Sequence, residues 1–137
     1  MLKGKILVVD NEDLLCDLIG QVLEMKGLTV TTMTNSVEAL EEIKQKKDYD
    51  IIIADIRMPK VSGIDLLKAS NDQNMNYQFI LVTGIYHLDS SDILKLLNPF
   101  GLIRKPFDIS MLITTVDQAL KKKIEIENFT RQNCSGK

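Results

Sequence analysis

The chain has 137 residues, 45% of them apolar and 26% charged, which fits one globular domain and excludes a disordered or collagen-like chain. Its 17 basic and 19 acidic residues give a formal net charge of -2, so the chain lacks the overall positive field that non-specific nucleic-acid binding needs. The first apolar run, residues 6–9, is too short for a signal peptide or a membrane span, and we expect a cytoplasmic protein that binds neither membranes nor nucleic acid directly.

Strand and helix patterns alternate five times along the chain. In chain order, the expected elements are a strand at residues 6–9, a helix at 14–23, a strand at 28–33, a helix at 35–48, a strand at 51–54, a helix at 64–69, a strand at 79–82, a helix at 89–97, a strand at 102–103 and a helix at 109–120. The strands are short and continuously apolar, as in a parallel sheet covered on both faces, except that residues 28–33 are more polar and suit an edge. Local signals mark two helix ends, since Asn35 has capping-box spacing with Glu38 and Gly27 is a plausible C-terminal cap.

This alternation predicts an α/β fold, with right-handed crossovers and a parallel sheet between two layers of helices. After Leu120 the core-building pattern stops, and the composition becomes first charged and then polar. We therefore expect one domain over residues 1–121, followed over residues 122–137 by a C-terminal helix extension, a linker or a tail.

Polar side chains follow the predicted strands at the sheet edge where ligands bind in open parallel sheets, outside the carboxyl ends of the strands. These residues are Asp10, Asn11, Glu12, Asp55, Thr83 and Lys105. Adjacent carboxylates repel each other, and Mg²⁺ is the natural ion to relieve that repulsion because it uses one or two carboxylates together with phosphate oxygens. A hydroxyl and an ammonium can then hold the other oxygens of a phosphoryl group while a carboxylate acts as the nucleophile.

Four motifs carry these residues in order: residues 6–12 (ILVVDNE), residues 55–63 (DIRMP followed by Ser-Gly), residues 82–84 (VTG) and residues 105–107 (KPF). Each motif follows a predicted strand, and their joint occurrence at one sheet edge is far more specific than any one of them. Together with the alternating elements, they resemble the receiver domain of two-component response regulators, of which the chemotaxis regulator is the small single-domain example. The resemblance covers residues 3 to about 121, and it implies a flavodoxin-like doubly wound sheet of five parallel strands in the order 2-1-3-4-5.

The resemblance also implies roles for the site residues. Asp55 would accept a phosphoryl group from a phosphohistidine on a sensor histidine kinase or phosphotransfer protein. Mg²⁺ would be held by Asp10, by Asp55 and by the backbone carbonyl of Arg57, with Asn11 as a further candidate ligand. Thr83 would hydrogen-bond the phosphoryl oxygen.

Lys105 would pair with the phosphoryl charge, and the Lys105–Pro106 bond is often cis in this family. Such a chain is not a turnover enzyme, because it catalyses only its own phosphorylation and dephosphorylation. Phosphorylation would switch the binding of a downstream effector domain or protein through the face formed by the fourth helix, the fifth strand and the fifth helix.

The chain departs from the family pattern at two positions. Asn11 stands where the family usually has the second carboxylate of its acidic pair, which predicts weaker Mg²⁺ binding without loss of phosphorylation. Glu12 could supply part of the missing charge through water. Leu102 stands where the family commonly has a Tyr or Phe that follows the threonine, so an aromatic side chain cannot report phosphorylation there.

These departures motivate an alternative function, a degenerate receiver that binds partners without being phosphorylated. Retention of Asp10, Asp55, Thr83 and Lys105 argues against it. A third class comprises flavodoxins and aspartate-nucleophile phosphatases of the same fold. Residues 10–12 (DNE) match neither the phosphate loop of the first nor the Asp-x-Asp motif of the second.

Overall fold

The computed structural model describes residues 3–73, 77–84 and 98–135, and the helix expected over residues 89–97 lies outside them. The described strands form one parallel sheet in the order β2-β1-β3-β4-β5. The strands are β1 (Lys5–Val9), β2 (Thr29–Met33), β3 (Ile51–Asp55), β4 (Gln78–Thr83) and β5 (Gly101–Arg104). This sheet confirms the predicted α/β class and the strand order that the resemblance implied, with the more polar β2 at one edge.

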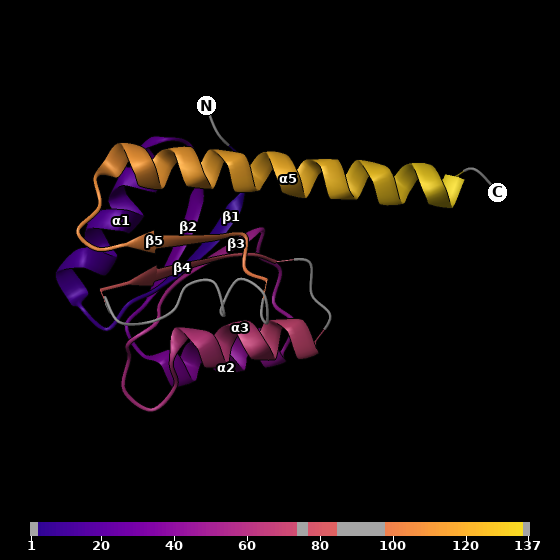
Figure 1. Ribbon diagram of the computed structural model, residues 1–137. Coiled ribbons are helices and arrows are strands. Elements are labelled where there is room, and N and C mark those ends of the chain that lie inside the picture. Colours follow the sequence, from indigo (N-terminus) through magenta and orange to yellow (C-terminus); the bar gives the residue numbers. More distant parts are fainter. Residues whose placement is uncertain (1–2, 74–76, 85–97, 136–137) are drawn as a thin grey trace.

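Helices cover both faces of the sheet. The described helices are α1 (Asp13–Met25), α2 (Ser36–Lys44), α3 (Gly63–Asp72) and α5 (Ile109–Ser135). Figure 1 shows α1 and α5 on one face and α2 and α3 on the other. None of the helices among these residues is long and apolar enough to cross a membrane.

Two hydrophobic clusters, one on each side of the sheet, explain why the inner strands are continuously apolar. In β1, Ile6 and Val8 pack in the cluster that includes buried residues of α1 and α5, whereas Leu7 and Val9 pack in the cluster that includes those of α2 and α3. Successive side chains of a strand point to opposite faces, so a strand with two covered faces needs apolar residues at every position. All four are at most 1% exposed.

The helix ends follow local signals, of which the sequence analysis identified only some. Asn35 caps α2 as predicted, since its side chain accepts hydrogen bonds from the backbone N–H groups of Val37 and Glu38. The helix expected at residues 64–69 is longer, spanning Gly63–Asp72, and it begins at a capping box between Ser62 and Asp65.

The last helix continues well past the predicted core pattern. Its first part buries Leu112, Val116, Ala119 and Leu120 against the sheet. The helix then runs on to Ser135, and Figure 1 shows this second part extending beyond the edge of the sheet. The segment 122–135 is therefore a direct extension of α5, in which Ile124 and Phe129 are exposed.

Candidate functional site

The candidate residues converge at the carboxyl edge of the sheet. Asp10 follows β1, and Asp55 and Thr83 are the last residues of β3 and β4. All three are buried, with exposed fractions of 2%, 5% and 2%. Parallel strands bring their carboxyl ends to one edge, so residues that lie 28 to 73 positions apart along the chain reach the same place.

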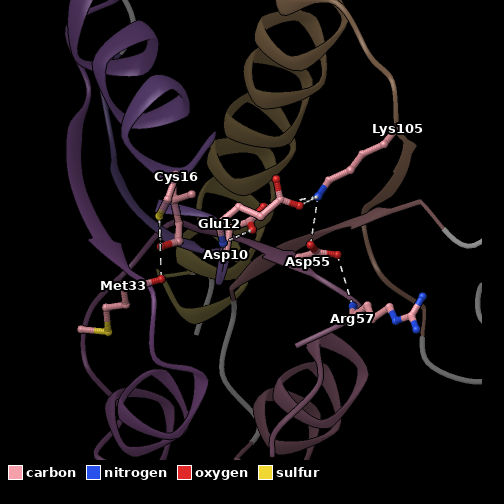
Figure 2. Close-up of polar contacts among 8 residues, drawn as sticks. Asp10, Glu12, Cys16, Met33, Asp55, Arg57 and Lys105 are labelled. Carbon is pink, nitrogen blue, oxygen red and sulfur yellow. Dashed lines mark hydrogen bonds and ion pairs between the residues drawn. The ribbon is translucent and has the colours of Figure 1, made fainter. Parts of the chain in front are cut away.

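Lys105 joins these carboxylates from the segment that follows β5. Its Nζ atom lies 3.0 Å from Oδ2 of Asp55, 3.4 Å from Oε1 of Glu12 and 3.6 Å from Oδ2 of Asp10 (Figure 2). Its backbone N–H donates a 2.7 Å hydrogen bond to the carbonyl oxygen of Thr83, which ties the lysine to the end of β4. The Lys105–Pro106 peptide bond is cis, as the family resemblance implied.

The charges at this edge perturb one another. Burial raises the pKa of Asp10, and the charges of Asp55 and Glu12 raise it further, against a hydrogen bond from the Glu12 N–H and the attraction of Lys105. Burial by itself would lower the pKa of Lys105, but its hydrogen bond to Asp55 and the surrounding carboxylates outweigh this and raise it. Three carboxylates and one ammonium leave a formal charge of -2 at the edge.

This set of donors fits a hard divalent cation. One carboxylate oxygen from each of Asp10, Glu12 and Asp55 lies within 4.8 Å of the other two. Carboxylate oxygens are the ligands that Mg²⁺ prefers, and it accepts an open site because it keeps several waters. The cluster contains no histidine or cysteine, the ligands typical of zinc.

The loop after β3 shapes the surroundings of Asp55. The backbone N–H of Arg57 donates a 3.2 Å hydrogen bond to Oδ1 of Asp55, and Figure 2 shows the Arg57 side chain directed away from the carboxylates. The loop closes on its own first residue after β3 through a hydrogen bond from the Gly63 N–H to the Ile56 carbonyl oxygen, 3.1 Å long. A Cβ atom at Gly63 would lie 2.4 Å from the backbone oxygen of Asp55, so only glycine allows this approach.

An open cavity of about 540 Å³ gives access to Asp55 and Lys105. Asn11 and Glu12 line one part of it, and residues of the loop after β3 line another. Small solutes can therefore reach Asp55 from solvent, although the carboxylate itself is almost fully buried. Leu102, the second departure from the family pattern, is half-buried against the cluster on the α2 and α3 side of the sheet.

The structure thus places every predicted site residue at one edge and brings Asp10, Glu12, Asp55 and Lys105 into direct contact range. Gly63 is not among the predicted site residues, although the spacing of Ser62 and Asp65 marks the helix start beside it. The contact of the Glu12 carboxylate with Lys105 joins residues 93 positions apart, and no local pattern in the sequence predicts it.

Comparisons with known proteins agree with this geometry. Residues 6–117 match the family model of the response regulator receiver domain. The chain is 32% identical over 120 residues to the DNA-binding transcriptional regulator NtrC of Escherichia coli strain K12, covering 88% of this chain and 25% of that protein. It is also 32% identical over 117 residues to the response regulator SaeR of Staphylococcus epidermidis, covering 85% of this chain and 50% of the relative. The chain therefore spans half or less of the length of these relatives.

Solved structures with the same fold include several receiver domains. A response regulator receiver domain protein from Clostridium thermocellum superimposes with a TM-score of 0.81 at 30% identity, covering 90% of this chain and 98% of that one. The chemotaxis protein CheY4 of Vibrio cholerae superimposes with a TM-score of 0.77 at 26% identity, covering 87% of this chain and all of that one.

Proposed function

The chain belongs to the response regulator receiver domain family, and from this premise we propose that it accepts a phosphoryl group on Asp55 in a Mg²⁺-dependent reaction. The observation that carries the proposal is the 3.0 Å contact between Lys105 and the buried Asp55 carboxylate at the base of an open cavity. The donor is a phosphohistidine on a sensor histidine kinase or a phosphotransfer protein.

In the proposed reaction, a carboxylate oxygen of Asp55 attacks the phosphorus atom of the phosphohistidine. The new O–P bond forms as the P–N bond breaks, and the imidazole leaves with the electron pair and takes up a proton on its nitrogen. The product is an aspartyl phosphate, which water later hydrolyses to restore Asp55. The domain performs this chemistry on itself, and is in this sense not a turnover enzyme.

The residues around Asp55 each have a part in this proposal. Lys105 stabilises the phosphoryl charge, and Thr83 donates a hydrogen bond to a phosphoryl oxygen. Asp10, Asp55 and the Arg57 carbonyl would hold Mg²⁺, which when bound would offset the negative charge of the incoming phosphoryl oxygens. The open cavity admits the donor side chain to the buried Asp55 carboxylate.

The output of the domain is a change in partner binding. The charge added at Asp55 biases the face that includes β5 and α5 toward a downstream effector domain or protein. The fourth helix expected from the sequence, the other part of this predicted face, lies outside the described residues. Leu102 on β5 gives that face an aliphatic side chain where an aromatic one is common in the family, so the switch depends on repacking rather than on an aromatic rotamer. Cytoplasmic location, with no direct binding of nucleic acid or membrane, completes the proposal.

A degenerate receiver, which binds partners without phosphorylation, is the second candidate, and Asn11 is the feature that favours it. Intact-mass spectrometry separates the two. The protein is incubated with a small-molecule phosphodonor, with and without Mg²⁺, beside the Asp55→Asn variant. A Mg²⁺-dependent gain of one phosphoryl group that the variant lacks supports phosphorylation. If neither the donor nor a purified phosphorylated kinase adds mass to the folded wild type, the degenerate receiver is correct.

A further inference from the structure

We propose that Glu12 supplies the second acidic charge of the Mg²⁺ site, in place of the neutral side chain of Asn11. The inference rests on the proposed function, because it concerns the ion that the phosphorylation reaction requires. Two buried carboxylates, Asp10 and Asp55, and the ammonium of Lys105 give a formal charge of only -1. Glu12 brings this to -2, which matches a divalent cation.

The geometry places the Glu12 carboxylate within this site. One of its oxygens lies within 4.8 Å of carboxylate oxygens of both Asp10 and Asp55. Its Oε1 atom is 3.4 Å from Nζ of Lys105, the same atom that contacts Asp55 at 3.0 Å. Figure 2 shows the Glu12 side chain extending toward Lys105 above the other two carboxylates. Glu12 also lines the cavity that gives access to Asp55.

Local structure does not account for this orientation. Glu12 is the N-cap residue of α1, but its side chain makes no capping hydrogen bond, so the carboxylate is not used to satisfy the helix terminus. Its backbone N–H instead donates a 2.9 Å hydrogen bond to Oδ1 of Asp10, which fixes the two residues relative to each other. The Glu12 side chain is 64% exposed, so packing does not force it inward, and its ion pair with Lys105 favours the observed orientation.

Asn11 lies beside the same site without adding charge. It is exposed and lines the cavity that contains Asp55, and it also borders a neighbouring cavity of about 230 Å³ next to the start of α2. Its amide oxygen can serve as a neutral ligand, but a neutral ligand attracts a divalent cation far less than a carboxylate does. The acidic pair of the site is therefore Asp10 and Glu12, which are separated by one residue in the sequence instead of being adjacent.

The test measures Mg²⁺ affinity directly, by ¹H–¹⁵N NMR titration of unphosphorylated protein at constant ionic strength. The variants are Glu12→Gln, the double variant Asn11→Asp/Glu12→Gln, and Glu24→Gln as a matched control. Glu24 is an exposed glutamate near the other end of α1, so its substitution makes the same change of net charge away from the site. We expect Glu12→Gln to bind Mg²⁺ about tenfold more weakly, because a unit charge acts on a divalent cation at close range even through water. The control keeps wild-type affinity, and the double variant recovers it.

Three results would overturn the inference: wild-type affinity in Glu12→Gln, an equal loss in Glu24→Gln, or a double variant that binds as weakly as Glu12→Gln. Intact-mass spectrometry of the wild type separates this inference from the function on which it rests. Wild-type affinity in Glu12→Gln together with Mg²⁺-dependent phosphorylation of the wild type refutes only the role of Glu12. A wild type that neither binds Mg²⁺ nor gains a phosphoryl group refutes both proposals.

Discussion

Replacing Asp10 by Asn should stabilise the fold when no metal ion is bound. Asp10 is only 2% exposed, and it shares the sheet edge with the carboxylates of Asp55 and Glu12. Asn keeps an oxygen that can accept the hydrogen bond from the Glu12 N–H, which is 2.9 Å long, and it has nearly the shape of Asp. The substitution therefore removes a charge with little change in packing.

The magnitude follows from the distances. At an effective dielectric constant of ~20, two unit charges 4.8 Å apart interact by about 3.5 kcal/mol, so the Asp55 carboxylate repels Asp10 by at least about this much. Attraction to Lys105 at 3.6 Å contributes about 4.6 kcal/mol in the opposite direction. Repulsion from the exposed Glu12 and the cost of burying the Asp10 charge both disfavour the charged wild-type side chain. The Asn variant should therefore gain about 1–2 kcal/mol in the free energy of unfolding.

The assay is thermal unfolding in EDTA and in 10 mM Mg²⁺. In EDTA, Asp10→Asn should raise the melting temperature by about 5 °C, as a gain of this size implies for a domain of this length. Mg²⁺ should stabilise the wild type by mass action and the variant much less. The difference in melting temperature between the two proteins should therefore narrow or reverse in Mg²⁺. A variant less stable than the wild type in EDTA would contradict this prediction, because the charge of Asp10 would then be a net source of stability.

Three further predictions concern other parts of the molecule. Lys105→Met should slow acceptance of the phosphoryl group, which time-resolved intact-mass spectrometry would check, because Lys105 provides a cation 3.0 Å from the Asp55 carboxylate. Gly63→Ala should cost about 2 kcal/mol or more, seen as a lower urea midpoint, because its Cβ would lie 2.4 Å from the Asp55 carbonyl oxygen. Burial and nearby negative charge raise the pKa of Tyr77 to about 12, and its hydroxyl donates to the Lys47 carbonyl. The neutral phenol is therefore favoured in the folded state. The contribution of Tyr77 to the free energy of unfolding should be fully present below pH 10, and about 1–2 kcal/mol of it should be lost as the pH rises from 10 to 12. Tyr77→Phe should flatten this fall in urea titrations at pH 9 and 11.5.

Much of the fold could be predicted because its signals are local and repeated. Continuous apolar runs identified strands buried on both faces, as at residues 51–54, all at most 1% exposed. The Asn35 cap was predictable because it is a local interaction: the Asn35 side chain accepts hydrogen bonds from the backbone N–H groups two and three residues later in the chain. Helix ends were less predictable. The expected helix at 109–120 stops where apolar spacing fades, but α5 continues to Ser135 because it extends an existing helix through good helix formers such as Lys and Glu.

The amino-acid pattern is enough to predict which residues stand at the carboxyl edge of the sheet. Asp10 and Asp55 follow strands with a clear apolar pattern, and parallel strands must end at one edge. How those side chains contact one another depends on residues far apart along the chain and follows only from the folded arrangement. The Lys105 ammonium contacts three carboxylates, and Glu12 turns from a helix terminus toward it. Lysine and glutamate side chains have many rotamers of similar energy, so charges 50 and 93 positions away, rather than neighbouring residues, select the one observed.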